Sequence, residues 1–295
     1  KQAESQGETV AQWVKEMLDA GNESFYKREG GKKLYYDIDS KSYQPVPGTE
    51  EFIILDNYRD KKPVHTTSET ILHDIGDGVL CLEFTSPHNS IGEGVLRGIN
   101  ESIELAEAGD WRGIVIGNDA TNFTVGANLM MIAMMAYQQE FDELNMAVNL
   151  FQQTVMRARY SKIPVVAATQ GYVFGGGCEL TMHCDAAVCA AESYIGLVEV
   201  GVGLIPGGAG TKEFAVRTSD AFFEGDVQIP TLIQNFKTIA LASVATSAHE
   251  AYGYNYLLPR KDSVVINRNR NIAEAKDKVL ELAEDYVMPS QREDV

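Results

Sequence analysis

Two glutamates in the middle of the chain have the residue type and spacing for acid–base chemistry. Glu179 follows a glycine triplet at 175–177, and Glu199, twenty positions later, follows a Gly-Leu-Val sequence at 196–198. A reaction that removes a proton from one atom and delivers one to another needs two titratable groups, and a carboxylate pair can supply both. We therefore expect the two glutamates to act together if the fold brings them to one place.

The elements around these glutamates predict a site with hydrogen-bond donors. An apolar strand at 164–170 runs into the glycine triplet, which opens a short helix over 178–185, and a second glycine-rich loop at 201–210 follows Glu199. The start of a helix presents free backbone N–H groups, and the helix dipole favours negative charge there. The stretch therefore indicates a place where an anion is stabilised beside two carboxylates.

The composition bounds the class of protein. The chain has 295 residues, enough for one large or two small domains, with 44% hydrophobic and 23% charged residues. A formal net charge of −17 argues against nucleic acid or an anionic membrane as a partner. No run approaches the roughly 18 apolar residues of a membrane helix. The polar first residues do not form a signal peptide and lack a methionine, so we expect a cytoplasmic protein and a fragment or processed form.

The cysteines favour core packing over metal binding. Three of the four lie in the predicted strand–helix–strand stretch, where small buried residues are expected, so we interpret all four as reduced core thiols. His183 stands beside Cys184, but no C-x-x-C or H-x-x-x-H spacing supports a zinc site, and we predict no metal. The four cysteines are Cys81, Cys178, Cys184 and Cys189.

The chain changes character after its first seventy residues. A helix is predicted over 9–21, followed by an aromatic and charged stretch that is typical of a hairpin or extended arm, and by a linker at about 60–69. From residue 71 short apolar strands alternate with amphipathic helices, which predicts a mainly parallel sheet with covering helices. The predicted strands are 79–84, 113–116 and 164–170, and the predicted helices are 90–107, 142–160, 178–185 and 271–286.

Three segments together resemble the crotonase (enoyl-CoA hydratase/isomerase) superfamily. They are FTVGANL at 123–129, GYVFGGGCELTMHCD at 171–185 and IGLVEVGVGLIPGGAGT at 195–211. They occur in the order and spacing of that family, and the resemblance covers about 71–259. It implies an α/β fold, a crotonase-like spiral of ββα units with a helical C-terminal region.

The beginning of the chain resembles a different enzyme. WVKEMLDAGNESFY and KLYYD look like the last helix and tail of a 3-hydroxyacyl-CoA dehydrogenase, as found in bifunctional proteins of fatty-acid β-oxidation. The resemblance implies that residues 1–70 are the end of a dehydrogenase helical domain and a linker, and that residues 71–295 are the crotonase-like domain. The implied partners are an acyl-CoA, the dehydrogenase portion of the same longer protein and, since crotonase units commonly form trimers, further copies of the chain.

The family's chemistry carries over to specific positions. The resemblance implies that the backbone N–H groups of Ala127 and Gly176 hold the carbonyl oxygen of a thioester, with Gly175 beside the substrate. It implies that Glu179 activates a water and that Glu199 delivers a proton to Cα, which hydrates a 2-enoyl-CoA to a 3-hydroxyacyl-CoA. Gly207 matches a backbone position near that water. No cofactor is implied beyond the CoA of the substrate, and NAD would serve only a dehydrogenase domain absent from this chain.

Two other functions remain open at this point. Related Δ3-Δ2-enoyl-CoA isomerases often keep only the glutamate that matches Glu199, and a non-catalytic acyl-CoA-binding module would need neither acid. The chain also departs from the family pattern: it has Asn128 where many relatives have Asp, and PGGAG at 206–210 in place of PGAGG. The segment at 84–90 lacks the Lys or Arg that many relatives place there for the CoA phosphates, so Lys212, Arg97 or a tail lysine is the candidate anchor.

The methionine-rich run at 129–137 has two interpretations. Methionine commonly fills gaps in a core, and core packing is the prediction for this run. The alternative is that these side chains line a tunnel for the acyl chain, because they directly follow Ala127.

Overall fold

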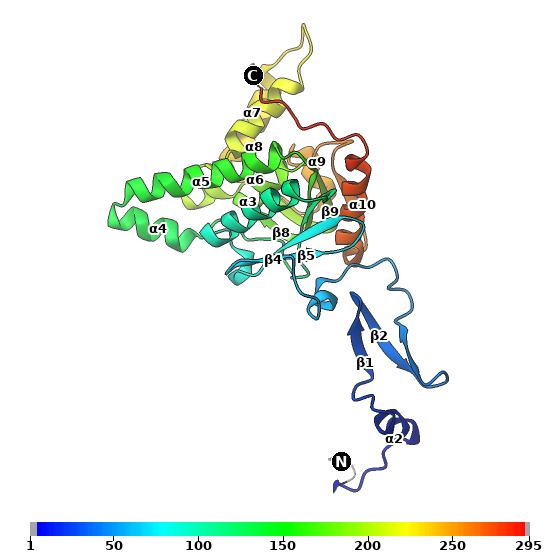
Figure 1. Cartoon of the computed structure of the whole chain (residues 1–295). Helices are drawn as coiled ribbons and strands as arrows, with labels where there is room; N and C mark the ends of the chain where they lie inside the picture. The colour runs from blue at the N-terminus through cyan, green and yellow to red at the C-terminus, as the bar shows by residue number, and fades with distance from the viewer. Residues whose placement is uncertain (1–4, 293–295) are drawn as a thin grey trace. The chain divides into compact units, whose positions relative to one another are not determined.

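The computed structural model describes residues 5–292, which form two compact units with their boundary between Lys62 and Pro63 (Figure 1). No helix among these residues combines the length and apolar character needed to cross a membrane.

The first unit is a helix followed by a small antiparallel sheet in the order β1-β2-β3. The β1–β2 hairpin turns through Gly30 and Gly31, which have φ angles of 63° and 82° that only glycine adopts readily. A side chain on Gly31 would also lie 2.7 Å from the ring of Tyr58. The predicted helix and hairpin are confirmed. The elements are α2 (Gln12–Asp19), β1 (Tyr26–Glu29), β2 (Lys32–Asp37), β3 (Ser42–Pro45) and the 3-10 helix η1 (Leu55–Tyr58).

The second unit is built on an eight-stranded sheet. Its order is β10-β9-β8-β7-β6-β5-β4, with β11 pairing to β9. The central strands β6 to β9 run parallel, as the alternating pattern predicts, and antiparallel strands flank them on both sides. The strands are β4 (His65–Thr66), β5 (Thr70–Asp74), β6 (Val79–Phe84), β7 (Gly113–Ile116), β8 (Val165–Phe174), β9 (Ala186–Gly196), β10 (Val244–Ala245) and β11 (Ser263–Val265).

The start of this sheet lies within the segment predicted to be a linker. Strand β4 pairs antiparallel with β5, and the side chain of Thr70 is buried. The extended segment is therefore shorter than the predicted 60–69, because backbone pairing recruits residues that carry no strong apolar pattern. The second unit begins at Pro63, before the sequence-based boundary at residue 71.

Helices cover the sheet and carry the glycine-rich turns. Figure 1 shows α10 on one side of the strands and α3 with α5 on another, and α10 contacts β7, β8 and β9. The predicted strands at 79–84 and 113–116 are confirmed to the residue. The helices are α3 (Glu93–Ala108), α4 (Leu129–Gln138), α5 (Phe141–Arg159), α6 (Gly176–His183), α7 (Gly210–Asp220), α8 (Ile229–Ala240), α9 (Ala248–Gly253) and α10 (Asn271–Ala283), with 3-10 helices η2 (Pro87–Asn89), η3 (Glu199–Val202) and η4 (Arg268–Arg270).

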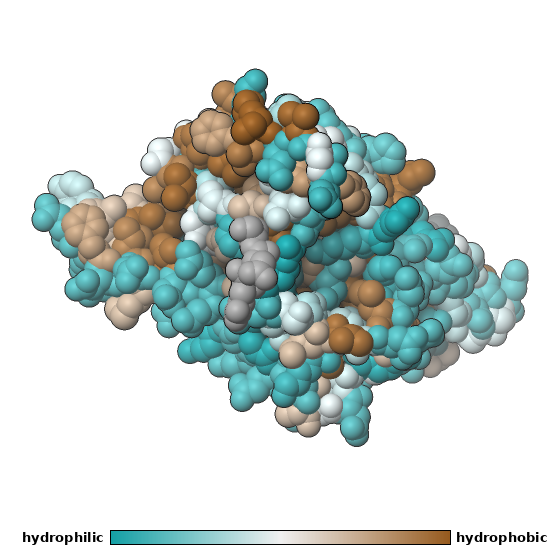
Figure 2. All heavy atoms as spheres, turned by 90° about the horizontal axis from the view of Figure 1, so that it is seen from above, coloured by the Kyte–Doolittle hydropathy of each residue, from teal (hydrophilic) through white to brown (hydrophobic). Residues whose placement is uncertain are grey.

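Two helices leave apolar side chains exposed. Helix α4 has no buried residue, and the side chain of Met130 is 74% exposed, so the prediction of core packing for the methionine-rich run is wrong. The reason is that α4 packs on the neighbouring helix α5 instead of on the sheet. Figure 2 shows hydrophobic side chains at the surface of one face of the molecule. On α8 and the loop before it the exposed apolar residues are Phe223, Val227, Ile229, Leu232, Ile233 and Phe236.

Candidate active site

Glu179 lies in the first turn of α6 with its carboxylate held by backbone donors. Its side chain is only 3% exposed. The N–H of Gly210, at the start of α7, donates to Glu179 Oε1 at 2.7 Å, and the Gly208 N–H also donates to this carboxylate. A buried carboxylate needs such partners, because an unpaired charge is costly away from water. The loop before α7 therefore fixes the orientation of Glu179.

Glu199 opens the 3-10 helix η3 and approaches the glycine turn before α6. Its Oε1 lies 3.1 Å from the point where a Cβ on Gly175 would stand, so this close approach favours glycine there. Gly175 also has a φ of 52°, which turns the chain from β8 into the helix. The other carboxylate oxygen, Oε2, is buried and has no hydrogen-bond partner among the described residues. Glu199 therefore has a free acceptor or proton-carrying atom inside the site.

The charge of Glu199 affects the titration of Glu179. Burial, and then the charge of Glu199, raises the pKa of Glu179 to about 8, although the N–H groups of Gly210 and Gly208 oppose the shift. Burial raises the pKa of Glu199 to about 7. Carboxylic acids ordinarily titrate near 4, and values close to neutral allow one group to hold a proton while the other accepts one. The structure thus brings together the two acids that the sequence singles out.

The backbone nitrogens of Ala127 and Gly176 lie next to each other. A Cβ on Gly176 would stand 3.5 Å from the Ala127 nitrogen, and a Cβ on Gly126 would stand 3.4 Å from the Gly176 nitrogen. Across residues 5–292 neither N–H has an acceptor. Gly176 is also the first residue of α6, where the helix dipole adds a favourable potential for an anion. Two adjacent donors of this kind can stabilise a negatively charged oxygen.

Asn128 caps the helix that follows these donors. Its Oδ1 accepts a hydrogen bond from the Met131 N–H at 3.2 Å, which is the role of an N-cap residue. The amide can serve here as an aspartate would, so the departure from the family pattern leaves the Ala127 N–H in place.

The glycine loop at 206–210 places Gly208 against the catalytic candidates. A Cβ on Gly208 would lie 2.3 Å from Glu179 Oε2, whereas a Cβ on Gly207 would come no closer than 3.7 Å to any atom outside its neighbours. The Gly207 carbonyl accepts a hydrogen bond from Gln152 Nε2 at 2.6 Å. Gly208 and Gly210 therefore contact the carboxylate, and a water-binding role for Gly207 stays a prediction.

The candidate anchors for CoA phosphates are all engaged elsewhere. Lys212 Nζ lies 2.9 Å from His183 Nε2 and 3.3 Å from Glu213, and Arg97 pairs with Glu101 at 3.6 Å. Tail lysines are paired as well: Lys276 with Asp77 at 2.7 Å and Lys278 with Glu281 at 2.9 Å. The structure therefore assigns no phosphate anchor among the residues that the sequence suggests.

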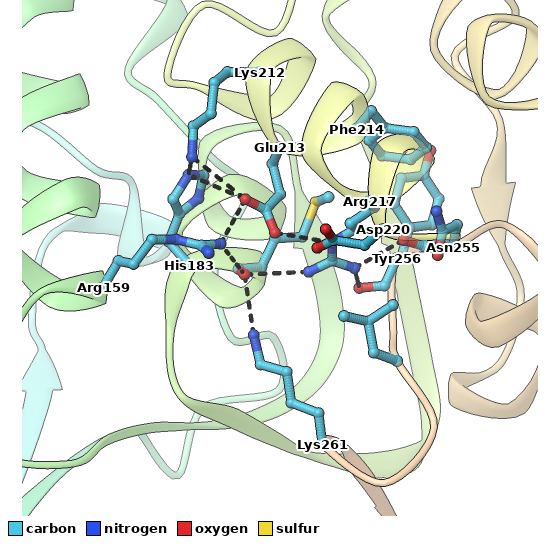
Figure 3. Close-up of polar contacts among 12 residues, drawn as sticks. Arg159, His183, Lys212, Glu213, Phe214, Arg217, Asp220, Asn255, Tyr256 and Lys261 are labelled. Carbon is cyan, nitrogen blue, oxygen red and sulfur yellow. Dashed lines mark hydrogen bonds and ion pairs between the residues drawn. The ribbon is translucent and has the colours of Figure 1, made fainter. Parts of the chain in front are cut away.

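A buried ionic cluster lies at the C-terminal end of α6 (Figure 3). Figure 3 shows Glu213 with Arg159 and Lys212 on one side and Arg217 on the other. Although burial opposes it, the charges of Arg217 and Arg159 lower the pKa of Glu213 to about 2, so this carboxylate is ionised. The cluster joins α5, α6 and α7, and its member His183 contacts the backbone carbonyl of Glu179.

His183 is a structural member of this cluster. Burial lowers the pKa of His183 to about 3, so the ring is neutral. Its Nδ1 donates to the Glu179 carbonyl at 2.6 Å, and its Nε2 accepts from Lys212. Asp185, just after the end of α6, also makes a structural hydrogen bond, because its carboxylate accepts from the Val165 N–H at 2.8 Å. All four cysteines are buried, as expected for core thiols.

Several residues of the site escape sequence reasoning. Gly208 and Phe151 both contact neighbouring site residues, and the Phe151 ring lies 2.6 Å from the Cβ positions of Gly176 and Gly208. Nothing in the local pattern distinguishes Phe151 from other core residues of α5. Glu213 and Arg217 stand four residues apart on α7, and this helical acid–base spacing is the one signal that could have indicated the cluster.

A cavity of about 550 Å³ opens elsewhere on the second unit. It lies at the second half of β8 and β9, and none of the predicted site residues lines it. Its lining includes Asn122, Gln170, Tyr172, Glu192, Tyr194 and Arg268.

Comparison with known proteins identifies the family and the fold of the chain. The family model described as enoyl-CoA hydratase/isomerase matches residues 74–222, and the chain belongs to this family. An enoyl-CoA hydratase from Polaromonas sp. JS666 shares the fold, with a TM-score of 0.61, 20% identity and coverage of 72% of this chain and 77% of that one. The predicted crotonase-like α/β fold is thereby confirmed.

Longer relatives match more of the chain. A probable 3-hydroxyacyl-CoA dehydrogenase of Bacillus subtilis (strain 168) is 38% identical over 293 residues, which is 99% of this chain and 36% of the relative. A putative fatty acid oxidation complex trifunctional enzyme of Rickettsia felis is 29% identical over 243 residues, covering 82% of this chain and 31% of the relative. The chain spans about a third of the length of these relatives.

Proposed function

We propose that this chain adds water to a 2-enoyl-CoA to give a 3-hydroxyacyl-CoA in fatty-acid oxidation. The observation that carries the proposal is the combination of a buried carboxylate, Glu179, and a half-buried one, Glu199, whose charge acts on it, with two backbone N–H groups that have no acceptor across residues 5–292. An acid pair alone could have many uses. Placed beside an oxyanion site, it suits a reaction in which negative charge builds on one oxygen while protons move nearby.

The proposed reaction uses each group once. The reaction starts from the arrangement in which Glu179 is ionised and Glu199 holds the proton. Because the pKa of Glu179 (about 8) lies above that of Glu199 (about 7), this is the less populated arrangement of the singly protonated pair. In it, Glu179 takes a proton from water as the water oxygen bonds to Cβ, and the electron pair of the double bond moves to the thioester oxygen. The N–H groups of Ala127 and Gly176 stabilise that enolate oxygen. Protonated Glu199 then delivers its proton to Cα, and the carbonyl re-forms. Water and substrate account for every atom of the product, so hydration needs no cofactor beyond the CoA that the substrate carries.

The resemblance at the N-terminus extends the proposal to a longer protein. A match over 99% of the chain to a probable 3-hydroxyacyl-CoA dehydrogenase supports the view that residues before the crotonase unit are the end of a dehydrogenase domain. A dehydrogenase that oxidises the 3-hydroxyacyl product would then lie in the same polypeptide. A cytoplasmic location and self-association into oligomers remain parts of this proposal.

The first experiment follows loss of the conjugated thioester absorbance of crotonyl-CoA. We expect hydration by the wild type, and a kcat lower by about 10²–10⁴-fold in Glu179→Gln and in Glu199→Gln, since each removes one proton-transfer group. The matched control is Glu224→Gln, which makes the same change on an exposed side chain and should keep full activity. Both active-site variants hydrating at the wild-type rate would overturn the proposal.

A second substrate separates hydration from its rivals. A 3-enoyl-CoA converted to the conjugated isomer, with crotonyl-CoA left unhydrated, would assign the chain as an isomerase. Tight binding of butyryl-CoA without turnover of either substrate would indicate a binding module.

A further inference from the structure

The two carboxylates stand on separate elements, so some contact must set their spacing. Glu179 belongs to α6, whereas Glu199 follows β9 and opens η3. Accepting the proposed hydration, we propose that Arg217 and Tyr256 are positioning residues that hold the Glu179 and Glu199 carboxylates at the separation the reaction needs. Among the hydrogen bonds and ion pairs of residues 5–292, neither residue contacts the two carboxylates or the two N–H donors directly.

Arg217 ties α6 to the segment after α9. It is 4% exposed, and its guanidinium donates to three backbone carbonyls. Nη2 donates to the Met182 carbonyl at 3.1 Å, three residues beyond Glu179 on α6. Nη1 donates to the carbonyls of Asn255 at 2.8 Å and Tyr256 at 2.9 Å. Only a planar, forked donor such as arginine can reach all three groups at once.

Tyr256 continues this connection to the strand that leads into Glu199. Its side chain is 1% exposed, and its hydroxyl accepts a hydrogen bond from the Leu197 N–H at 3.2 Å. The same hydroxyl donates to the Ser243 carbonyl at 2.7 Å. Leu197 directly follows the end of β9 and is two residues before Glu199. The hydroxyl therefore fixes the backbone between the sheet and the second glutamate.

Helix α7 contacts both the Glu179 side chain and the end of α6. The Gly210 N–H at its start holds the Glu179 carboxylate, while Arg217 near its end holds the carbonyl at the end of α6. Glu213 keeps Arg217 in place through a 3.0 Å bond from Nε to Oε1 (Figure 3). The chain of contacts therefore runs from Glu179 through α7 to Arg217, Tyr256 and Leu197, and on to Glu199.

The connection between the two carboxylates gives a reason for burying an arginine at position 217. A buried arginine is expensive to desolvate, and a hydrophobic residue of similar size could fill the space. Arg217 joins α6, which carries Glu179, to the backbone at 255–256, and the hydroxyl of Tyr256 in turn contacts the backbone two residues before Glu199. A misplacement of about 1 Å in a catalytic group can lower a rate by about 10²-fold, so a fixed spacing has a large effect on turnover.

The decisive variant is Tyr256→Phe, which removes one oxygen and keeps the ring. We expect kcat for crotonyl-CoA to fall about 10–100-fold with KM unchanged, because the oxyanion donors at Ala127 and Gly176 are not altered. The matched control is Tyr254→Phe, the same change on a neighbouring tyrosine whose ring lies 6.1 Å from that of Tyr256. It should leave both constants unchanged.

The pH profile provides a readout that loss of folded protein does not produce. Coupled acids titrate in two steps whose separation grows with their interaction. The groups that face the pair are the N–H donors of Gly208 and Gly210 and the side chains of Cys178 and Tyr256, and burial raises the pKa of both of these side chains, so they stay neutral. If the carboxylates move apart in Tyr256→Phe, the two limbs of the pH–rate profile move closer together.

The kinetics and the pH profile of Tyr256→Phe together test the positioning role. A lower kcat with a narrowed pH profile supports the positioning role. Unchanged kinetics, or a lower kcat with the wild-type pH profile, overturns it. A wild type without hydration refutes the proposed function instead, and a crystal structure of Tyr256→Phe then tests the inference directly: an unaltered distance between the two carboxylates overturns it. If Tyr256→Phe does not fold, Arg217→Lys, which keeps the charge and loses the fork, is assessed by the same criteria.

Discussion

Glu199 carries a free-energy cost that its proposed role accounts for. Within residues 5–292 one of its carboxylate oxygens is buried without a hydrogen-bond partner, and burial raises the pKa of Glu199 to about 7. A structural carboxylate would be expected to find donors for both oxygens. An acid that must hold and release a proton at neutral pH is better served by an environment that disfavours its charge.

This cost predicts a stabilising substitution. Because the folded-state pKa of Glu199 lies above its unfolded value of 4.5, the folded protein binds more protons, so the contribution of Glu199 to stability is full below the unfolded pKa and is lost as pH rises through about 7. Glu199→Gln, which stays neutral, should match the wild-type Tm at about pH 4, below the unfolded pKa, and exceed it at about pH 9, by roughly 2–4 °C for each kcal/mol relieved.

Calorimetry of both proteins across this pH range measures the effect. Glu224→Gln on the exposed loop should show no pH-dependent difference. A wild type that is the more stable of the two at high pH would contradict the buried, charge-disfavouring environment of Glu199.

At the scale of elements, Gly207 and Gly208 in the loop before α7 have different surroundings, so substituting them should have different effects. Gly208→Ala would place a methyl group 2.3 Å from Glu179 Oε2 and 2.6 Å from Phe151, whereas Gly207→Ala meets nothing closer than 3.7 Å. We expect the first to lower kcat by about 10–100-fold through displacement of Glu179, and the second to change it little.

Steady-state kinetics of Gly207→Ala and Gly208→Ala measures these effects and also tests which of the two glycines matters for the reaction. The sequence-based prediction assigns a water-binding role to Gly207, and the geometry places Gly208 against the carboxylate. Equal losses in both variants, or a loss confined to Gly207→Ala, would contradict the geometric interpretation.

At the scale of the molecule, the boundary between the two units can be tested by truncation. A variant beginning at Pro63 keeps β4, its pairing with β5 and the ion pair of His65 with Glu101 at 2.7 Å. A variant beginning at Ile71 loses all of these and the buried Thr70. We expect cooperative unfolding in both, with Tm lower by about 2–4 °C per kcal/mol lost in the shorter one.

Thermal unfolding of the two variants, followed by circular dichroism, measures this difference. Equal Tm values would place the functional start of the second unit at residue 71, as the sequence pattern alone suggests.

The sequence by itself determined the class of fold and the central elements, and it singled out the two glutamates that we propose as the acids. Strands such as β6 and β7 are short apolar runs with clear limits, and local pattern is sufficient to find them. Glu179 and Glu199 were recognisable because their glycine-rich surroundings carry a spacing that few other sites share.

Only the tertiary structure decided which groups hold these acids in place. The contacts of Gly208 with Glu179, of Arg217 with the end of α6 and of Tyr256 with Leu197 join residues that lie 29, 35 and 59 positions apart. Local propensity and periodicity say nothing about such pairs, because they depend on how β9, α6 and α7 pack around a common core. For the same reason the exposure of α4 was not predictable, because an apolar helix has the same sequence pattern whether it packs on a sheet or on another helix.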